Sequence, residues 1–277
     1  MTPNQYCQDK TAKSGSSFYY SFLFLPHERR QAIIALYAFC REVDDVVDEC
    51  SDTALARVKL AWWRNEIANT FSGNAQHPVT LALLPAINRY GLAAELFQEI
   101  IDGMEMDLDL NRFPDFKSLQ LYCYRVASVV GQLSAEIFGY QDRKTLKYAH
   151  DLGMAFQLTN IIRDVGEDAR RNRIYLPLDE MAQFGVSEAD ILNSNETEAF
   201  SCLMAYQIER AQHYYVQAFA ELPKVDRKSQ RPGLVMAAIY QTLLNEIRND
   251  GCRVLNSRTT LTPLRKLWIA WKTWIRG

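Results

Sequence analysis

Apolar residues recur every three or four positions through most of this chain, and this period is its strongest constraint on the fold. Residues three and four apart share one face of an α-helix, whereas a half-buried strand needs strict alternation, which is nearly absent here. With 277 residues, 48% of them hydrophobic, the chain can bury a sizeable core. We therefore predict an all-α fold and take residues 1–277 as one domain.

Glycine, proline and short polar runs mark where the helices end. Pro26 and Glu28 are typical of a first helical turn, so we expect one helix from there to about Glu49. The interruption RRNRIYLP, residues 170–177, predicts a loop at a candidate active site, followed by a helix that Ser187 caps. Further breaks occur near residues 72–78, 90–91, 111–114 and 139–142, so we predict roughly eight or more helices.

Charge and cysteine usage exclude several kinds of protein. The net charge of −2 gives no basic excess, so we expect no nucleic-acid partner. The six cysteines form no CxxC pair, and several lie within apolar patterns, which favours reduced thiols and a cytoplasmic location. Residues 1–16 have no apolar core like that of a signal peptide, and no run of about 18 apolar residues occurs, so we expect neither export nor a membrane span.

The segment YAFCREVDDVVDE, residues 37–49, places a set of polar side chains on one face of its predicted helix. The set comprises Tyr37, Arg41, Asp44, Asp45 and Asp48. Carboxylates crowded in this way repel one another unless a solvated surface or a cation relieves them. A single DxxxD pair of this kind is usually only a solvated helix face.

A second acidic segment, FQLTNIIRDVGED at residues 156–168, has a similar arrangement. Its polar stripe and flanks comprise Phe156, Asn160, Asp164, Glu167, Arg163 and Asp168. Magnesium prefers oxygen ligands and is commonly held by one or two carboxylates together with substrate phosphates. Two helices that each present a DxxxD pair to one cavity would supply such a site, and the paired occurrence favours function over a solvated face.

Arginine accompanies both acidic pairs, as binding of a diphosphate requires. Arg41 precedes the first pair and Arg163 precedes the second, and guanidinium groups bind phosphate oxygens in a bidentate way. In the loop that follows, the arginines of residues 170–171 are either ligands or solvated charges at a helix end. Arg173, beside Tyr175, is the better candidate ligand.

The segment LYCYRVASVVGQLSAEIFG, residues 121–139, combines an apolar stripe with small residues. The stripe comprises Tyr122, Val126, Val129, Val130 and Leu133. The small residues allow either close helix packing, which periodicity alone favours, or room for a long apolar chain. Most of the N-terminal aromatic residues belong in a core, and one or two could face a cation: Phe18, Tyr19, Tyr20, Phe22, Phe24, Tyr37 and Phe39.

Four motifs, taken in order, resemble those of the squalene/phytoene synthase family. They are SGSSFYYSFLFLP (14–26), YAFCREVDDVVDE (37–49), YCYRVASVVG (122–131) and LTNIIRDVGEDARRNRIYLP (158–177). The resemblance extends from about Gln5 to Leu255, and its N-terminal part is most similar to bacterial presqualene diphosphate synthases of hopanoid pathways. It implies an isoprenoid synthase fold, a single helical domain around a central cavity.

The resemblance also implies roles for individual residues. The implied catalytic set is Asp44, Asp48, Asp164, Asp168, Tyr37 and Arg41, and the implied metal ligands are Asp44, Asp48, Asn160, Asp164 and Asp168. The implied substrate-binding set is Ser17, Phe18, Asp45, Tyr122, Val126, Asn160, Arg163, Arg173 and Tyr175. For the family's C-terminal arginine ligand we favour Arg258 over Arg253. Gly15 stands where some relatives have a serine, so that contact is not expected here.

The activity that the resemblance implies is head-to-head condensation of two farnesyl diphosphates to presqualene diphosphate, with release of diphosphate. Mg²⁺ is expected, about two or three ions held with the substrate diphosphate. NADPH is not expected, since no GxGxxG follows a strand and no C-terminal membrane anchor like that of eukaryotic squalene synthases is present. The alternatives are phytoene synthase acting on geranylgeranyl diphosphate, full squalene synthase, and a non-catalytic assembly or binding factor, against which the complete acidic motifs argue.

The C-terminal segment LTPLRKLWIAWKTWIRG, with a helix expected at about 262–277, interleaves tryptophan with basic residues. These are Trp268, Trp271 and Trp274 with Arg265, Lys266, Lys272 and Arg276. The pattern is typical of an interfacial helix and predicts peripheral membrane contact, although a terminal helix docked on the core fits it equally well. Enzymes of the same pathway are further expected partners.

Overall fold

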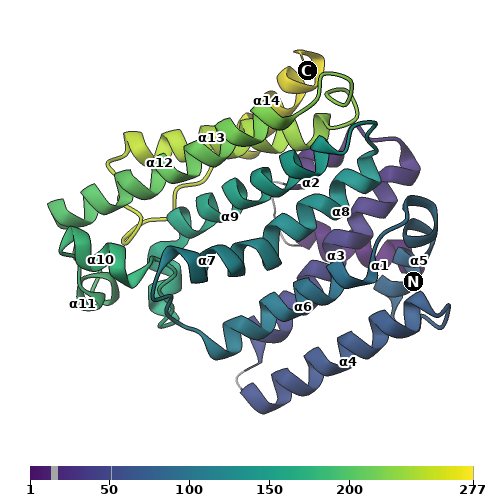
Figure 1. The fold of residues 1–277 in the computed structure, drawn as a ribbon, viewed down its shortest axis with the longest axis horizontal. Coiled ribbons are helices and arrows are strands. Elements are labelled where there is room, and N and C mark those ends of the chain that lie inside the picture. The colour runs from purple at the N-terminus through teal and green to yellow at the C-terminus, as the bar shows by residue number, and fades with distance from the viewer. Residues whose placement is uncertain (14–17, 51, 277) are drawn as a thin grey trace.

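A computed structural model describes residues 1–13, 18–50 and 52–276, and every regular element within them is helical (Figure 1). The first elements are α1 (Pro3–Lys13), α2 (Phe18–Phe22), α3 (His27–Glu49), α4 (Thr53–Phe71), α5 (Pro78–Tyr90) and α6 (Ala94–Asp109). The middle elements are α7 (Phe116–Cys123), the π-helix η1 (Tyr124–Ser128), α8 (Val129–Phe138) and α9 (Lys144–Arg170). The last are α10 (Leu178–Phe184), α11 (Glu188–Leu192), α12 (Glu198–Glu221), α13 (Arg231–Asn249) and α14 (Pro263–Arg276). The all-α prediction is confirmed.

Helix ends fall where capping residues predict them. Ser187 and Asp190 form a reciprocal capping box at the start of α11, as the sequence indicated for Ser187. Gly91 ends α5 with a φ of 64°, a left-handed conformation that glycine adopts without strain. The long predicted helix is α3, and Pro26 precedes its first residue instead of lying within its first turn.

Two clusters of buried apolar side chains form the interior. One gathers α9, α12 and α13, and the other gathers α3, α4, α5 and α6. Val129 and Leu133, which we predicted on the apolar stripe of residues 121–139, belong to the second cluster and are fully buried there. Phe18 and Val126 pack against both clusters, so the boundary between the clusters is where a cavity can open.

Small residues allow α8 and η1 to lie directly against α9. A Cβ on Gly131 would lie 2.5 Å from the carbonyl oxygen of Ala149, and a Cβ on Gly153 would lie 2.6 Å from Cα of Ser128. These glycines therefore serve close helix packing, the interpretation that periodicity favoured. Gly131 and Ser134 also border the cavity described below, so the same small residues leave room beside the helix.

α14 packs against α13 and α2 at one edge of the molecule, and α4 lies at the opposite edge (Figure 1). Among the helices that the structure describes, none is both long and apolar enough to cross a bilayer.

Candidate active site

A cavity of about 560 Å³ lies between α3 and α9, and side chains of α2, α6, α7, η1, α8 and α13 also line it. Both acidic segments reach it, because α3 and α9 turn their predicted polar faces toward the same space. Its polar lining comprises Tyr37, Arg41, Asp44, Asp48, Gln157, Asn160, Arg163, Asp164, Glu167, Asp168, Arg171 and Arg258. The structure thus brings together the two motifs that the sequence placed about 120 residues apart.

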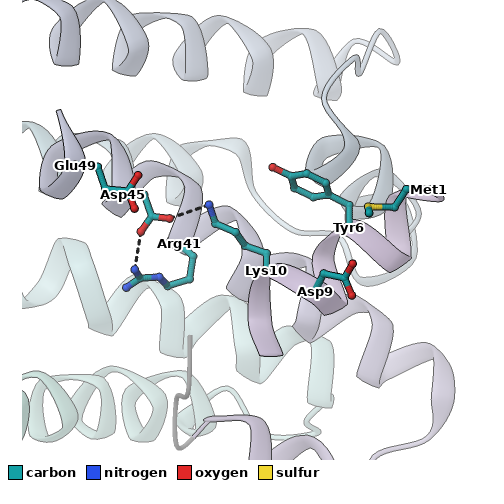
Figure 2. Close-up of a pocket in the computed structure, with 7 residues that line it drawn as sticks. All are labelled: Met1, Tyr6, Asp9, Lys10, Arg41, Asp45 and Glu49. Carbon is teal, nitrogen blue, oxygen red and sulfur yellow. Dashed lines mark hydrogen bonds and ion pairs between the residues drawn. The ribbon is translucent and has the colours of Figure 1, made fainter. Parts of the chain in front are cut away.

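The first motif divides between two sides of α3. Arg41 donates to Asp44 at 2.6 Å and to Asp45 at 2.5 Å. Asp44 lines the cavity, whereas Asp45 faces α1 and lies 2.8 Å from Nζ of Lys10 (Figure 2). Asp45 is not among the residues that line the cavity, because one residue along a helix turns a side chain by about 100°. Its contact with substrate stays a prediction.

Asp48 joins the loop after α9 to the end of α3. Its carboxylate accepts from Nη1 of Arg173 at 2.9 Å and lies 3.1 Å from Nη1 of Arg171. Arg171 borders the cavity, which favours the first of the two roles that the sequence left open for it, ligand or helix-end charge. Arg173, the preferred candidate, lies behind the cavity beside Asp168, and Tyr175 lies with it.

Asp107 of α6 organises two of the predicted tyrosines, and sequence reasoning missed it. It accepts from the hydroxyl of Tyr122 at 2.9 Å and from that of Tyr175 at 2.7 Å, and the two rings stack at 5.3 Å. Burial raises the pKa of Asp107 to about 6, although the hydrogen bond from Tyr175 and the charge of Arg173 oppose the shift. Tyr122 borders the cavity, so Asp107 fixes part of its wall.

Nothing in the sequence separates Asp107 from its acidic neighbours on α6. Asp102 and Glu105 form ordinary ion pairs with Arg64, at the outer side of the same helix. A helix that carries several carboxylates is usually predicted to expose them to solvent. Only packing against α7 and the loop before α10 places one of them inside the protein.

Two arginines, Arg163 within the second motif and Arg258 after α13, contact its first aspartate. Arg163 donates through two nitrogens to the carboxylate of Asp164, and Nε of Arg258 donates to the same carboxylate at 2.8 Å. Although burial opposes the shift, these hydrogen bonds lower the pKa of Asp164. The geometry agrees with our choice of Arg258 over Arg253.

A close backbone contact positions Arg258. The N–H of Gly166 donates to the carbonyl of Val254 at 3.2 Å, and any side chain at Gly166 would collide with the carbonyl of Leu255. Glycine on α9 therefore lets the segment after α13 rest on the helix, which carries Arg258 to within 3.3 Å of Glu167.

Two carboxylates of the cavity have raised pKa values. Burial raises the pKa of Asp44 to about 6, against the opposing charge of Arg41. Burial also raises the pKa of Asp168 to about 7, and the neighbouring charge of Asp164 adds to the shift. A cation that entered this space would relieve both costs.

The donor set fits magnesium held jointly with a phosphorylated ligand. In the part of the chain that the structure describes, no three Asp, Glu, His or Cys side chains converge closely enough to hold a metal ion by themselves. Oδ1 of Asn160 is buried and accepts no hydrogen bond from the described residues. Four carboxylates and this amide oxygen are hard ligands, and Mg²⁺ usually takes only one or two carboxylates and completes its shell with phosphates and water.

The remainder of the cavity is apolar and deep. Phe18, Tyr122 and Val126 line it as predicted, and the rings of Phe18 and Tyr37 lie 5.4 Å apart. Tyr148 borders the far end, about 24 Å from Asp164 along α9 at about 1.5 Å per residue. Of the other predicted aromatic residues, Phe22 lines the cavity and Phe39 packs in the core. Ser17, predicted to bind substrate, lies outside the described residues.

The far end is closed by side chains from α8, α9 and the residue that precedes α13. Phe138 and Tyr148 border it, together with Gln230, whose amide donates to the carbonyl of Gly139 at 3.0 Å. A closed apolar space that opens onto acidic and basic groups suits a long hydrocarbon chain with a charged head.

The sequence matches a known protein family. The family model for squalene/phytoene synthase matches residues 11–265. The chain belongs to this family. Among curated proteins, a phytoene synthase of Arthrospira platensis is 36% identical, over 94% of this chain and 89% of that protein. A 15-cis-phytoene synthase of Synechococcus elongatus is 34% identical, over 94% of this chain and 89% of its own length.

Solved structures share the arrangement of helices. A crystal structure of a dehydrosqualene synthase in complex with ligand has a TM-score of 0.86 and 27% identity, covering 98% of this chain and 95% of that one. A squalene synthase HpnC from Alicyclobacillus acidocaldarius has a TM-score of 0.78 and 27% identity, covering 90% and 94%. The chain has the isoprenoid synthase fold. As a squalene/phytoene synthase family member, it is a prenyltransferase that joins prenyl diphosphates head to head.

Proposed function

We propose that the chain condenses two farnesyl diphosphates to presqualene diphosphate and inorganic diphosphate. The observation that carries the reaction class is the placement of two complete DxxxD motifs on facing walls of one cavity. The C30 product is supported by the N-terminal resemblance to presqualene diphosphate synthases. It is also supported by the fold shared with structures described as a dehydrosqualene synthase and a squalene synthase.

The charged end of the cavity would hold the diphosphates. Mg²⁺ bound by Asp44, Asp48, Asn160, Asp164 and Asp168 would neutralise charge on the leaving diphosphate. Arg41 and Arg258 border the same space and supply guanidinium donors to phosphate oxygens. On binding, they would exchange their present carboxylate partners for phosphate.

The apolar part of the cavity would shelter the reacting carbons. The C1–O bond of the first substrate breaks, and its diphosphate leaves with the electron pair. The C2–C3 double bond of the second substrate attacks C1 of the allylic cation, which leaves a positive charge on C3. Loss of a proton from C1 of the first substrate then closes the cyclopropane ring between that carbon and C2 and C3 of the second substrate. Phe18 and Tyr37 lie on this wall, and aromatic faces stabilise a cation by about 0.5–2 kcal/mol each.

The departed diphosphate is the proposed proton acceptor. Burial raises the pKa of Tyr122 and of Tyr148 well above their usual range, so both tyrosines stay neutral and are weak bases. A diphosphate held beside the cation is a stronger base than either. The balance of this reaction requires no reductant, so NADPH has no part in the proposal.

Phytoene synthase is the second candidate, because the two curated relatives described above carry that name. It would use two geranylgeranyl diphosphates in the same cavity. The two activities need the same charged end and differ in the length of apolar space, which Phe138 and Tyr148 limit here.

Product analysis separates the candidates. Purified protein is incubated with Mg²⁺ and either farnesyl or geranylgeranyl diphosphate, first without and then with NADPH, and products are identified by mass spectrometry. A cyclopropyl C30 diphosphate formed without NADPH supports the proposal, whereas squalene formed only with NADPH extends it to a full squalene synthase. A C40 hydrocarbon establishes phytoene synthase instead. No product from either substrate leaves a non-catalytic binding factor as the explanation.

A further inference from the structure

α14 turns large apolar side chains toward solvent. Leu264, Trp268 and Ile275 are 80%, 58% and 60% exposed, and Leu267 and Trp271 are exposed beside them. At about 100° per residue, these five positions fall within about 100° of the helix circumference and form one continuous stripe. A terminal helix that only docks on a core buries its apolar face, so docking does not explain this stripe.

A neighbouring side of α14 is already occupied by the protein. Ala270 is fully buried, and the ring of Trp274 lies 5.2 Å from that of Phe24 and beneath the guanidinium of Arg231. The helix therefore has two apolar surfaces, one that holds it on α2 and α13 and one that remains uncovered. We call the uncovered surface, formed by Leu264, Leu267, Trp268, Trp271 and Ile275, the outer stripe.

Basic residues border the outer stripe along one side. Arg265 and Lys272 are exposed next to it, and residues 261–277 contain four basic residues and no acidic one although the whole chain has a net charge of −2. Apolar side chains with tryptophan, edged by cations, match the boundary between the headgroups and acyl chains of an anionic bilayer.

We propose that the outer stripe of α14 is a docking surface for an anionic lipid bilayer, on which the helix lies flat. A second copy of the chain fits less well. In a twofold dimer the same patch meets itself, so Lys272 of each copy would approach a like charge, whereas Arg265 already pairs with Glu246 of α13 at 2.5 Å. α14 also lies at an edge of the molecule (Figure 1).

The side of α14 that packs on the protein adjoins the cavity through a short path. Trp274 packs on Arg231, which lies between Gln230 and Pro232, and both of these border the far end of the cavity. A docked α14 would thus place the closed apolar end of the cavity near the membrane. The docking itself does not depend on the proposed reaction, because its test uses no substrate.

Vesicle sedimentation of the full chain tests the proposal. Wild-type protein is mixed with large vesicles of phosphatidylcholine alone, or of phosphatidylglycerol and phosphatidylcholine in equal parts. We expect binding to the anionic vesicles that weakens with added salt, and at least tenfold less binding to the neutral ones. Protein that remains in the supernatant with both vesicles overturns the proposal.

Matched variants locate the contact. Trp268→Ser/Trp271→Ser should weaken anionic binding at least tenfold, whereas Leu55→Ser/Val58→Ser, which removes exposed apolar side chains of α4 at the opposite edge, should leave it unchanged. Lys272→Glu should weaken binding severalfold and Lys59→Glu should not. Circular dichroism confirms that each variant is folded. Equal losses in the α4 variants contradict the proposal, as does a dimer by light scattering that only the tryptophan variant dissociates.

Discussion

Lys10 of α1 and Asp45 of α3 form an ion pair of 2.8 Å, which holds Asp45 outside the cavity while the adjacent Asp44 lines it. Arg41 joins both carboxylates, so four charged groups form a chain from α1 to the cavity: Lys10, Asp45, Arg41 and Asp44. Figure 2 shows the first three of them. Two consecutive aspartates of one motif therefore have different surroundings.

Substitution of these two aspartates should separate their roles. Asp44→Asn removes a carboxylate that faces the proposed metal and diphosphate, so kcat should fall by about a hundredfold to a thousandfold. Asp45→Asn weakens only the support of Arg41, and kcat should stay within about tenfold of wild type. Steady-state rates with farnesyl diphosphate measure both. Equal losses would mean that Asp45 also acts at the reacting centre.

Asp48 and Asp164 lie on facing walls, and each should be required separately. Asp48→Asn or Asp164→Asn should abolish turnover while helicity by circular dichroism stays nearly unchanged, because each side chain is polar and borders the cavity. Asp109 pairs with Arg57 away from the cavity, so Asp109→Asn is the control and should retain activity. Near-normal rates in both cavity variants would rule out the two-motif mechanism.

The far end of the cavity should set the preferred chain length. Phe138→Ala removes a side chain from that end, so the ratio of kcat/KM for geranylgeranyl over farnesyl diphosphate should rise about tenfold. The same change leaves a void and should cost about 3 kcal/mol of the free energy of unfolding.

Phe97→Ala provides the matched control for that experiment. Phe97 is fully buried beside Phe39, outside the cavity, so its loss should cost similar stability without changing the substrate ratio. If both variants shift the ratio alike, the effect comes from general loosening and not from cavity length.

Asp107 should make the stability of the protein depend on pH. Its folded pKa of about 6 exceeds that of an unfolded aspartate, near 3.9, so between these values the folded state binds more protons. The stability of the wild type relative to Asp107→Asn should therefore fall as pH rises, by about 1 kcal/mol between pH 5 and pH 7.5. Denaturant unfolding at both pH values measures it, and a difference of opposite sign would show that Asp107 is better stabilised as an anion.

Helix positions and most of the cavity-lining residues could be predicted from the sequence. The 3.6-residue period decides which side chains share a face, so Arg41, Asp44 and Asp48 were correctly grouped, as were Asn160 and Asp164. Capping at Ser187 and the breaks at glycine and proline are equally local. Asp45 marks the limit of this reasoning, since a helical face is broad and only the neighbouring helix decides which of two adjacent carboxylates it covers.

The sequence by itself determined the helical class, the two acidic motifs and the family, because all three depend on residue type and short-range spacing. Only the tertiary structure decided that Asp107 holds Tyr122 and Tyr175, and that Gly166 admits the segment carrying Arg258. It alone also decided that the stripe of α14 faces outward. These contacts join segments far apart in the chain, and their partners are set by how the helices pack, which no local pattern records.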